Sequence, residues 1–159
     1  METLIPIAAR IAEALKARRQ TIAVAESSSG GLISAALLAV PGASAYYLGG
    51  GVIYTGRALK QLLGVERAQL EGMRSSSEPY AQFLANTVRE NFRSTWGISE
   101  TGAAGPSGNP YGDAPGHSCM AISGPVERVI TLETESADRA ANMRAFAAAA
   151  LELLERELA

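Results

Sequence analysis

The sequence predicts an α/β protein: a three-layer α/β/α sandwich around a mixed, mostly parallel sheet of about five strands. Two observations support this prediction. Apolar residues alternate along the chain between helical spacing and short β-branched runs. The resulting order of elements is α, β, α, β, α, α, β, β, β, α, which argues for a mixed sheet whose final hairpin supplies an antiparallel strand.

The first half of the chain contains two strands, each preceded and followed by a helix. Residues 4–19 have an apolar stripe and basic residues in the last turn, so they predict an amphipathic helix. The run TIAVA (21–25) is typical of a buried strand, and residues 30–38 favour a helix up to the VPGAS break. The next strand is LGGGVIYT (48–55), in which glycines permit a close backbone approach, and RALKQLLG (57–64) is a short helix.

A longer helix, residues 75–92, opens the second half. Ser77 is a suitable cap, and the glutamate and proline that follow it suit a first helical turn. The run WGISETG (96–102) predicts a third strand. It leads into residues 103–116, a turn-rich loop that is too long to be a mere connector.

The last part of the chain predicts a β-hairpin and a final helix. HSCMAIS (117–123) and VERVITLET (126–134) read as two strands joined through a Gly-Pro turn. The helix is expected to start at a Ser136 cap and to run to Leu158.

Composition bounds the possible classes of protein. The 159 residues, 47% of them hydrophobic, suit a single globular domain over residues 1–159. A net charge of −2 argues against a nucleic-acid partner, and no run reaches the roughly 18 apolar residues of a membrane span. The single cysteine, Cys119, excludes an internal disulfide, and no targeting signal is evident, so we expect a cytoplasmic protein.

Two loops that follow predicted strands are the candidate site. Ligands of such sheets gather where strands end and helices begin. ESSSGG, residues 26–31, would place the amides of Ser28 to Gly31 at a helix amino terminus, which favours phosphate, carboxylate or a developing oxyanion. TGAAGPSG, residues 101–108, offers small residues whose backbone can approach a ligand closely. Taken alone, the serines are more simply a helix cap and the second loop a surface turn.

Other chemistry-bearing residues have plain structural interpretations. His117, the only histidine, has no partners at metal-ligand spacing, so we expect no metal site. Tyr54 is most simply an amphipathic residue at a sheet end. Arg139 and Arg144 on the final helix are most simply solvated.

Five motifs in order resemble the CinA carboxy-terminal domain family over nearly the whole chain. They are AESSSGG (25–31), VPGASAYYLGGGVIYT (40–55), LLGV (62–65), SSSEP (75–79) and TGAAGP (101–106). The resemblance implies a three-layer α/β/α fold. It also implies hydrolysis of the carboxamide of nicotinamide mononucleotide to nicotinate mononucleotide and ammonia, with no cofactor. Members of the family often assemble, so the resemblance further implies a homo-oligomer.

The resemblance also implies roles for individual residues. Ser27 matches the serine nucleophile, and Tyr54 and Thr101 match family motif positions at the catalytic site. A helix amino terminus would supply the donors that stabilise the oxyanion. The substrate phosphate would lie against the 102–108 amides and Arg144. The implied substrate-binding residues are Ser28, Ser29, Gly30, Gly31, Gly102, Gly105 and Arg144.

The sequence departs from the family pattern at the expected base. In ungapped alignment Leu59 occupies the place of the family lysine, and Lys60 follows one residue later. Because one residue rotates a helical side chain by roughly 100°, Lys60 reaches Ser27 only if the helix is rotated. The stretch APGHSC (114–119) also replaces a family stretch that carries a lysine.

Three functions therefore remain open. The first is an active amidohydrolase in which Lys60, or with less support His117 or Glu26, activates Ser27. The second is a protein that keeps the nucleotide or anion pocket but has lost catalysis. The third is a protein-interaction module related to competence or DNA damage.

Overall fold

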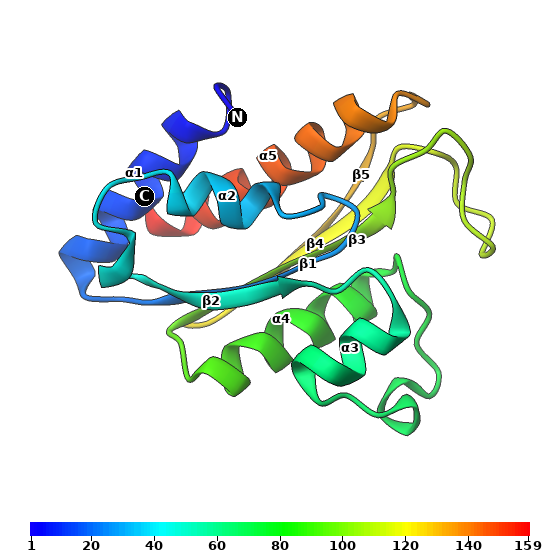
Figure 1. Cartoon of the computed structure of the whole chain (residues 1–159), viewed down its shortest axis with the longest axis horizontal. Coiled ribbons are helices and arrows are strands. Elements are labelled where there is room, and N and C mark those ends of the chain that lie inside the picture. Colours follow the sequence, from blue (N-terminus) through cyan, green and yellow to red (C-terminus); the bar gives the residue numbers. More distant parts are fainter.

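One five-stranded sheet, in the order β2-β1-β3-β4-β5, lies between two layers of helices (Figure 1). The structure is a computed structural model that describes residues 1–159. The strands are β1 (Ile22–Glu26), β2 (Tyr47–Val52), β3 (Trp96–Ala103), β4 (His117–Ser123) and β5 (Arg128–Glu133). β1 pairs in parallel with β2 and β3, whereas β4 pairs antiparallel with β3 and β5. All strands except β4 therefore run in one direction, which confirms the mixed, mostly parallel sheet.

Helices cover both faces of the sheet, as the order of elements predicts. One layer contains α1 (Ile5–Arg18), α2 (Leu32–Leu38) and α5 (Arg139–Leu158), and the other contains α3 (Gly56–Leu63) and α4 (Glu78–Phe92) (Figure 1). The predicted succession of helices and strands is confirmed in full. None of the helices is both long and apolar enough to cross a membrane.

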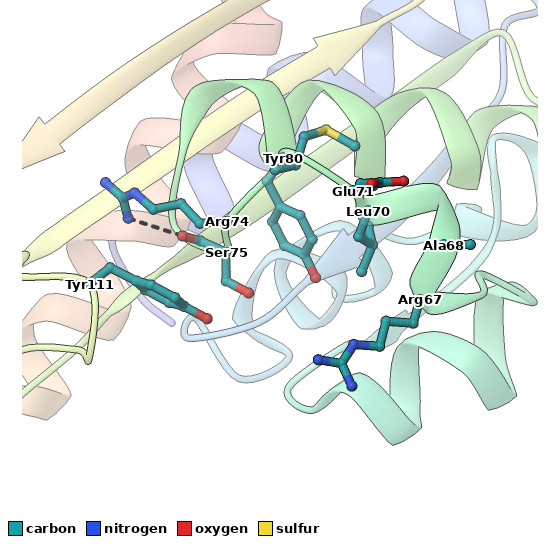
Figure 2. Close-up of a pocket in the computed structure, with 9 residues that line it drawn as sticks. Arg67, Ala68, Leu70, Glu71, Arg74, Ser75, Tyr80 and Tyr111 are labelled. Carbon is teal, nitrogen blue, oxygen red and sulfur yellow. Dashed lines mark hydrogen bonds between the residues drawn. The ribbon is translucent and has the colours of Figure 1, made fainter.

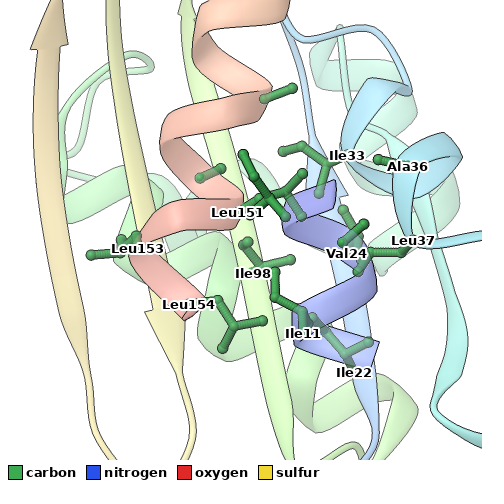
Figure 3. Packing of buried hydrophobic residues seen from close by; sticks show 14 of the residues in the cluster. Ile11, Ile22, Val24, Ile33, Ala36, Leu37, Ile98, Leu151, Leu153 and Leu154 are labelled. Carbon is green, nitrogen blue, oxygen red and sulfur yellow. The ribbon is translucent and has the colours of Figure 1, made fainter. Parts of the chain in front are cut away.

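The alternation of side chains along β1 divides the core into two parts. Ile22 and Val24 belong to the larger cluster beneath α1, α2 and α5, together with Ile98 of β3 (Figure 3). Ala23 and Ala25 belong to the cluster beneath α3 and α4. Successive residues of a strand point to opposite faces of the sheet, so this register also fixes the direction of the residues that follow.

Two helix starts differ from the prediction. α2 begins at Leu32 rather than near Gly30, because Gly30 and Gly31 have φ values of +67° and +98° that a helix cannot use. α5 begins at Arg139, because the side chain of Asp138, not that of Ser136, accepts the cap hydrogen bond from the Ala141 amide at 3.0 Å.

Candidate active site

Ser27 borders a cavity of about 360 Å³ at the carboxyl end of β1, on the side of α3 and α4. It follows Ala23 and Ala25 at intervals of two residues, which explains why it lies on this face. Thr101 of β3 lies on the same face, since Ser99, two residues earlier, donates to the α4 carbonyl of Ala81 at 2.6 Å. We call this cavity the Ser27 chamber. Its lining includes Ser27, Ile53, Tyr54, Leu59, Tyr80, Thr101, Gly102 and Tyr111.

Two buried carboxylates hold the serine loop from the opposite face. Glu100 accepts hydrogen bonds from the amides of Ser27 at 3.1 Å and Ser29 at 2.8 Å, and from the hydroxyl of Ser28. Its fourth donor is the hydroxyl of Ser118, at 2.7 Å. The two carboxylates are those of Glu26 and Glu100. Both side chains are fully buried, and neither forms an ion pair; hydrogen bonds from amides and hydroxyls satisfy them instead.

Glu26 caps α2 from within the protein. Its carboxylate accepts from the Ser29 hydroxyl at 2.8 Å and from three backbone amides at the start of α2 at 3.0 Å each. Four donors satisfy this carboxylate, and the Ser27 hydroxyl is not among them. Glu26 is therefore a structural cap rather than the base for Ser27.

These caps change the expectation for the helix amino terminus. The amides of Ser29 and Gly31 already donate to Glu100 and Glu26, and the Gly30 amide donates to the Ser27 carbonyl at 3.0 Å. Ser29, Gly30 and Gly31 line no pocket. Of the four expected anion-binding residues, only Ser28 borders a pocket, and its amide donates no hydrogen bond within the chain.

A second cavity, of about 270 Å³, adjoins the Ser27 chamber, and we call it the anion pocket. The two cavities share Tyr54, Gly102, Asn109 and Pro110. The expected residue Gly105 lines the anion pocket with φ +107°, and its amide makes no hydrogen bond within the chain. No carboxylate lines this cavity.

Arg139 is the only charged residue that lines the anion pocket. Its guanidinium donates to the Gly105 carbonyl and, at 3.2 Å, to the Tyr54 hydroxyl. The structure corrects the expectation for Arg144, which is exposed and lines no pocket. Arg144 lies five residues after Arg139, which is about 140° around the helix. When Arg139 points into the anion pocket, Arg144 therefore points away from it.

The helix α3 corrects the expectation for Lys60. Leu59 is only 2% exposed and lines the Ser27 chamber, whereas Lys60 does not line it. The Lys60 ammonium is instead 3.1 Å from the carboxylate of Glu66, and both side chains are exposed to solvent. Adjacent helical residues differ in direction by roughly 100°, so when Leu59 points into the chamber, Lys60 points away from it.

His117 is a structural clamp and not a base for Ser27. Its Nδ1 bonds the Glu133 carboxylate, and its Nε2 lies 2.8 Å from the Ser76 carbonyl. Burial lowers the pKa of His117, but these hydrogen bonds and the charges of Glu133 and Asp113 outweigh burial and raise it overall. The Ser76 amide donates to the Thr101 hydroxyl at 3.1 Å, so the clamp positions one wall of the Ser27 chamber.

Sequence reasoning missed the roles of two residues. The sequence around Arg139 predicts only a solvated residue, because its partners Gly105 and Tyr54 are distant along the chain. The role of Glu100 could have been found from the sequence. It is the one charged residue in an otherwise uncharged strand, and a buried carboxylate needs several hydrogen-bond donors around it. No group of three His, Cys, Asp or Glu residues is arranged to hold a metal ion.

The fold and the cavities define a three-layer α/β domain with a serine and an anion pocket at the carboxyl ends of adjacent strands. Residues 4–158 match the model of the CinA C-terminal domain. The chain belongs to the CinA C-terminal domain family.

Curated relatives and solved structures agree with this assignment. The chain is 40% identical over 154 residues to a CinA-like protein of Salinibacter ruber, covering 97% of this chain and 37% of the relative. A CinA-like protein of Synechococcus is 42% identical over 118 residues, which are 74% of this chain and 28% of the relative. The chain thus spans less than two fifths of the length of these relatives.

Solved structures of similar length have the same fold. The competence damage-inducible protein A (ComA) of Klebsiella pneumoniae superimposes with a TM-score of 0.90 at 26% identity, covering 98% of this chain and 96% of that one. The competence/damage inducible protein CihA of Agrobacterium tumefaciens gives a TM-score of 0.88 at 27% identity, with 98% and 94% covered.

Proposed function

We propose that this chain binds a nucleotide across the Ser27 chamber and the anion pocket without hydrolysing an amide. The observation that carries the proposal is the position of Leu59, an apolar side chain in the chamber, while Lys60 pairs with Glu66 outside it. The resemblance assigns the base of the family reaction to a lysine at position 59.

The two cavities suit the two ends of a nucleotide. The anion pocket combines free amides with a guanidinium and no carboxylate, which favours a phosphate group. The Ser27 chamber has no charged lining residue and has tyrosines and aliphatic side chains in its walls, which suits an aromatic ring, including the cationic nicotinamide ring. The shared residues at their junction, Tyr54 and Gly102 among them, would let one ligand occupy both.

Catalysis would require a group that removes the Ser27 proton. A serine hydroxyl is a weak nucleophile until an adjacent base accepts its proton. No Lys, His, Asp or Glu lines the chamber, and burial raises the pKa of Tyr80, which keeps its phenol protonated. The nearby carboxylates of Glu26 and Glu100 are each satisfied by four donors.

Calorimetric titration and ammonia release test this proposal with nicotinamide mononucleotide as the probe. We expect binding by the wild type and no ammonia above background. Arg139→Gln should weaken binding about tenfold or more, since a hydrogen bond to a charged group contributes about 1.5–3 kcal/mol. Arg144→Gln removes an equal charge from the outer face of the same helix, so it should leave affinity unchanged.

Two results would overturn the proposal. Ammonia release that disappears in a Ser27→Ala variant would establish an active amidohydrolase. If neither binding nor release is observed, the interaction-module function remains, in accord with the competence and damage names of the similar structures.

A further inference from the structure

The Ser27 chamber continues into a third cavity on the side away from the anion pocket. This distal pocket has a volume of about 650 Å³ and shares Leu70, Ser75, Tyr80 and Tyr111 with the chamber (Figure 2). It shares no residue with the anion pocket. A ligand that enters the chamber from the anion pocket can therefore extend into the distal pocket.

The distal pocket contains two arginines with different surroundings. Arg74 donates to both carboxylate oxygens of Asp113, at 2.6 Å and 3.1 Å, and lies over the Tyr111 ring at 5.5 Å. Its charge is thus neutralised, and its main effect is to hold the tyrosine wall. Arg67 is exposed and makes neither an ion pair nor a side-chain hydrogen bond, so its five donors are available to a ligand.

The walls of the distal pocket favour a flat or extended group that reaches Arg67. Tyr80 is buried and Tyr111 is half exposed, and both rings belong to the lining that the distal pocket shares with the chamber (Figure 2). One carboxylate, that of Glu71, also borders the pocket, but Figure 2 shows it directed away from the Arg67 guanidinium. The positive end of the distal pocket is therefore at Arg67.

We propose that the distal pocket binds a second acidic group, a carboxylate or phosphate, carried on the base side of the nucleotide. This inference rests on the proposed function, because it assumes a phosphate at Arg139 and a ring in the Ser27 chamber. The ligand class is then a nucleotide with an acidic substituent on its base, anionic at both ends and aromatic in the middle. A simple mononucleotide would leave the Arg67 end of the site unused.

The test compares AMP with AMP that carries a succinyl group on its N6 atom (adenylosuccinate), by calorimetric titration of the full chain. We expect the dicarboxylate probe to bind about tenfold more tightly, a difference of about 1.4 kcal/mol. Arg67→Gln should remove this advantage and leave the affinity for AMP unchanged. Arg57→Gln is the matched control, because Arg57 is an exposed arginine on α3 that lines no pocket.

The outcomes separate this inference from the proposed function. If AMP binds, Arg139→Gln weakens it and the dicarboxylate probe binds no better than AMP, the distal site is wrong and the nucleotide site stands. If Arg67→Gln weakens both probes equally, Arg67 does not contact the substituent and the inference is overturned. If neither AMP nor the dicarboxylate probe binds, the distal inference is overturned, and the titration with nicotinamide mononucleotide decides separately whether the nucleotide site stands.

Discussion

Replacing Leu59 by lysine is predicted to give this chain amide-hydrolysing activity toward nicotinamide mononucleotide. The new ammonium would enter the Ser27 chamber from α3, because Leu59 already lines that cavity. Partial burial lowers the pKa of a lysine, which is the change that a general base near neutral pH requires. A positioned base contributes about 10²–10⁴-fold, so ammonia release should rise at least about 100-fold over the wild type.

Leu59→Lys should also lower the free energy of unfolding, by an amount that follows from the burial of Leu59. Leu59 is 2% exposed and belongs to the smaller core cluster with Ile53, Leu63 and Tyr80. Loss of its burial costs about 1.5–3 kcal/mol and desolvation of the new ammonium adds to this cost, against the about 5–15 kcal/mol that stabilises a typical domain. The variant should therefore fold with a lowered Tm.

Three controls make the result interpretable. Leu59→Met, which conserves volume, should gain no activity, and Leu59→Lys combined with Ser27→Ala should lose what Leu59→Lys gains. Lys60→Met should change nothing in either background. The reasoning is refuted if Leu59→Lys folds and binds the nucleotide yet releases no more ammonia than the wild type, or if Lys60→Met abolishes activity.

Two further predictions concern the framework of the site. Glu100→Ala should lower the free energy of unfolding by about 2–6 kcal/mol, because it leaves the part-buried amide of Ser27 and the buried amide of Ser29 without acceptors at about 1–3 kcal/mol each; a smaller loss of unfolding free energy in urea titration would contradict the capping role. The raised pKa of His117 means that its stabilisation is fully present below its unfolded pKa and is lost as pH rises through its folded pKa. Thermal unfolding across neutral pH should show this decline in the wild type and a flatter profile in His117→Gln; parallel profiles would contradict it.

Most of the fold could be predicted because local periodicity reports which faces are buried. The helical spacing of residues 4–19 and the apolar run of β1 gave elements that agree with the structure to within a residue or two. Helix boundaries were less predictable where caps decide them. Asp138 and Ser136 are both good caps, and only the path of the chain out of β5 selects Asp138.

The candidate site was predictable in part. The motifs predicted Ser27, Tyr54 and Thr101 as catalytic residues; the structure places all three around one chamber, and their catalytic roles stay predictions. The structure places Arg144 and Lys60 outside the two cavities, because spacing along a helix gives only the relative directions of its side chains, and packing decides which of them points to the site.

The sequence by itself determined the order of the elements, the burial of β1 and the loop that carries Ser27, since each depends on interactions among residues close along the chain. Only the tertiary structure decided that Leu59 lines the same chamber as Ser27, that Arg139 reaches Tyr54 and that Glu100 holds the serine loop. Those relations join residues far apart in sequence, and they depend on the rotation of α3 and α5 against the sheet. Local periodicity indicates which face of each helix is buried, but contacts between residues far apart in sequence fix the final rotation and the neighbours of each side chain.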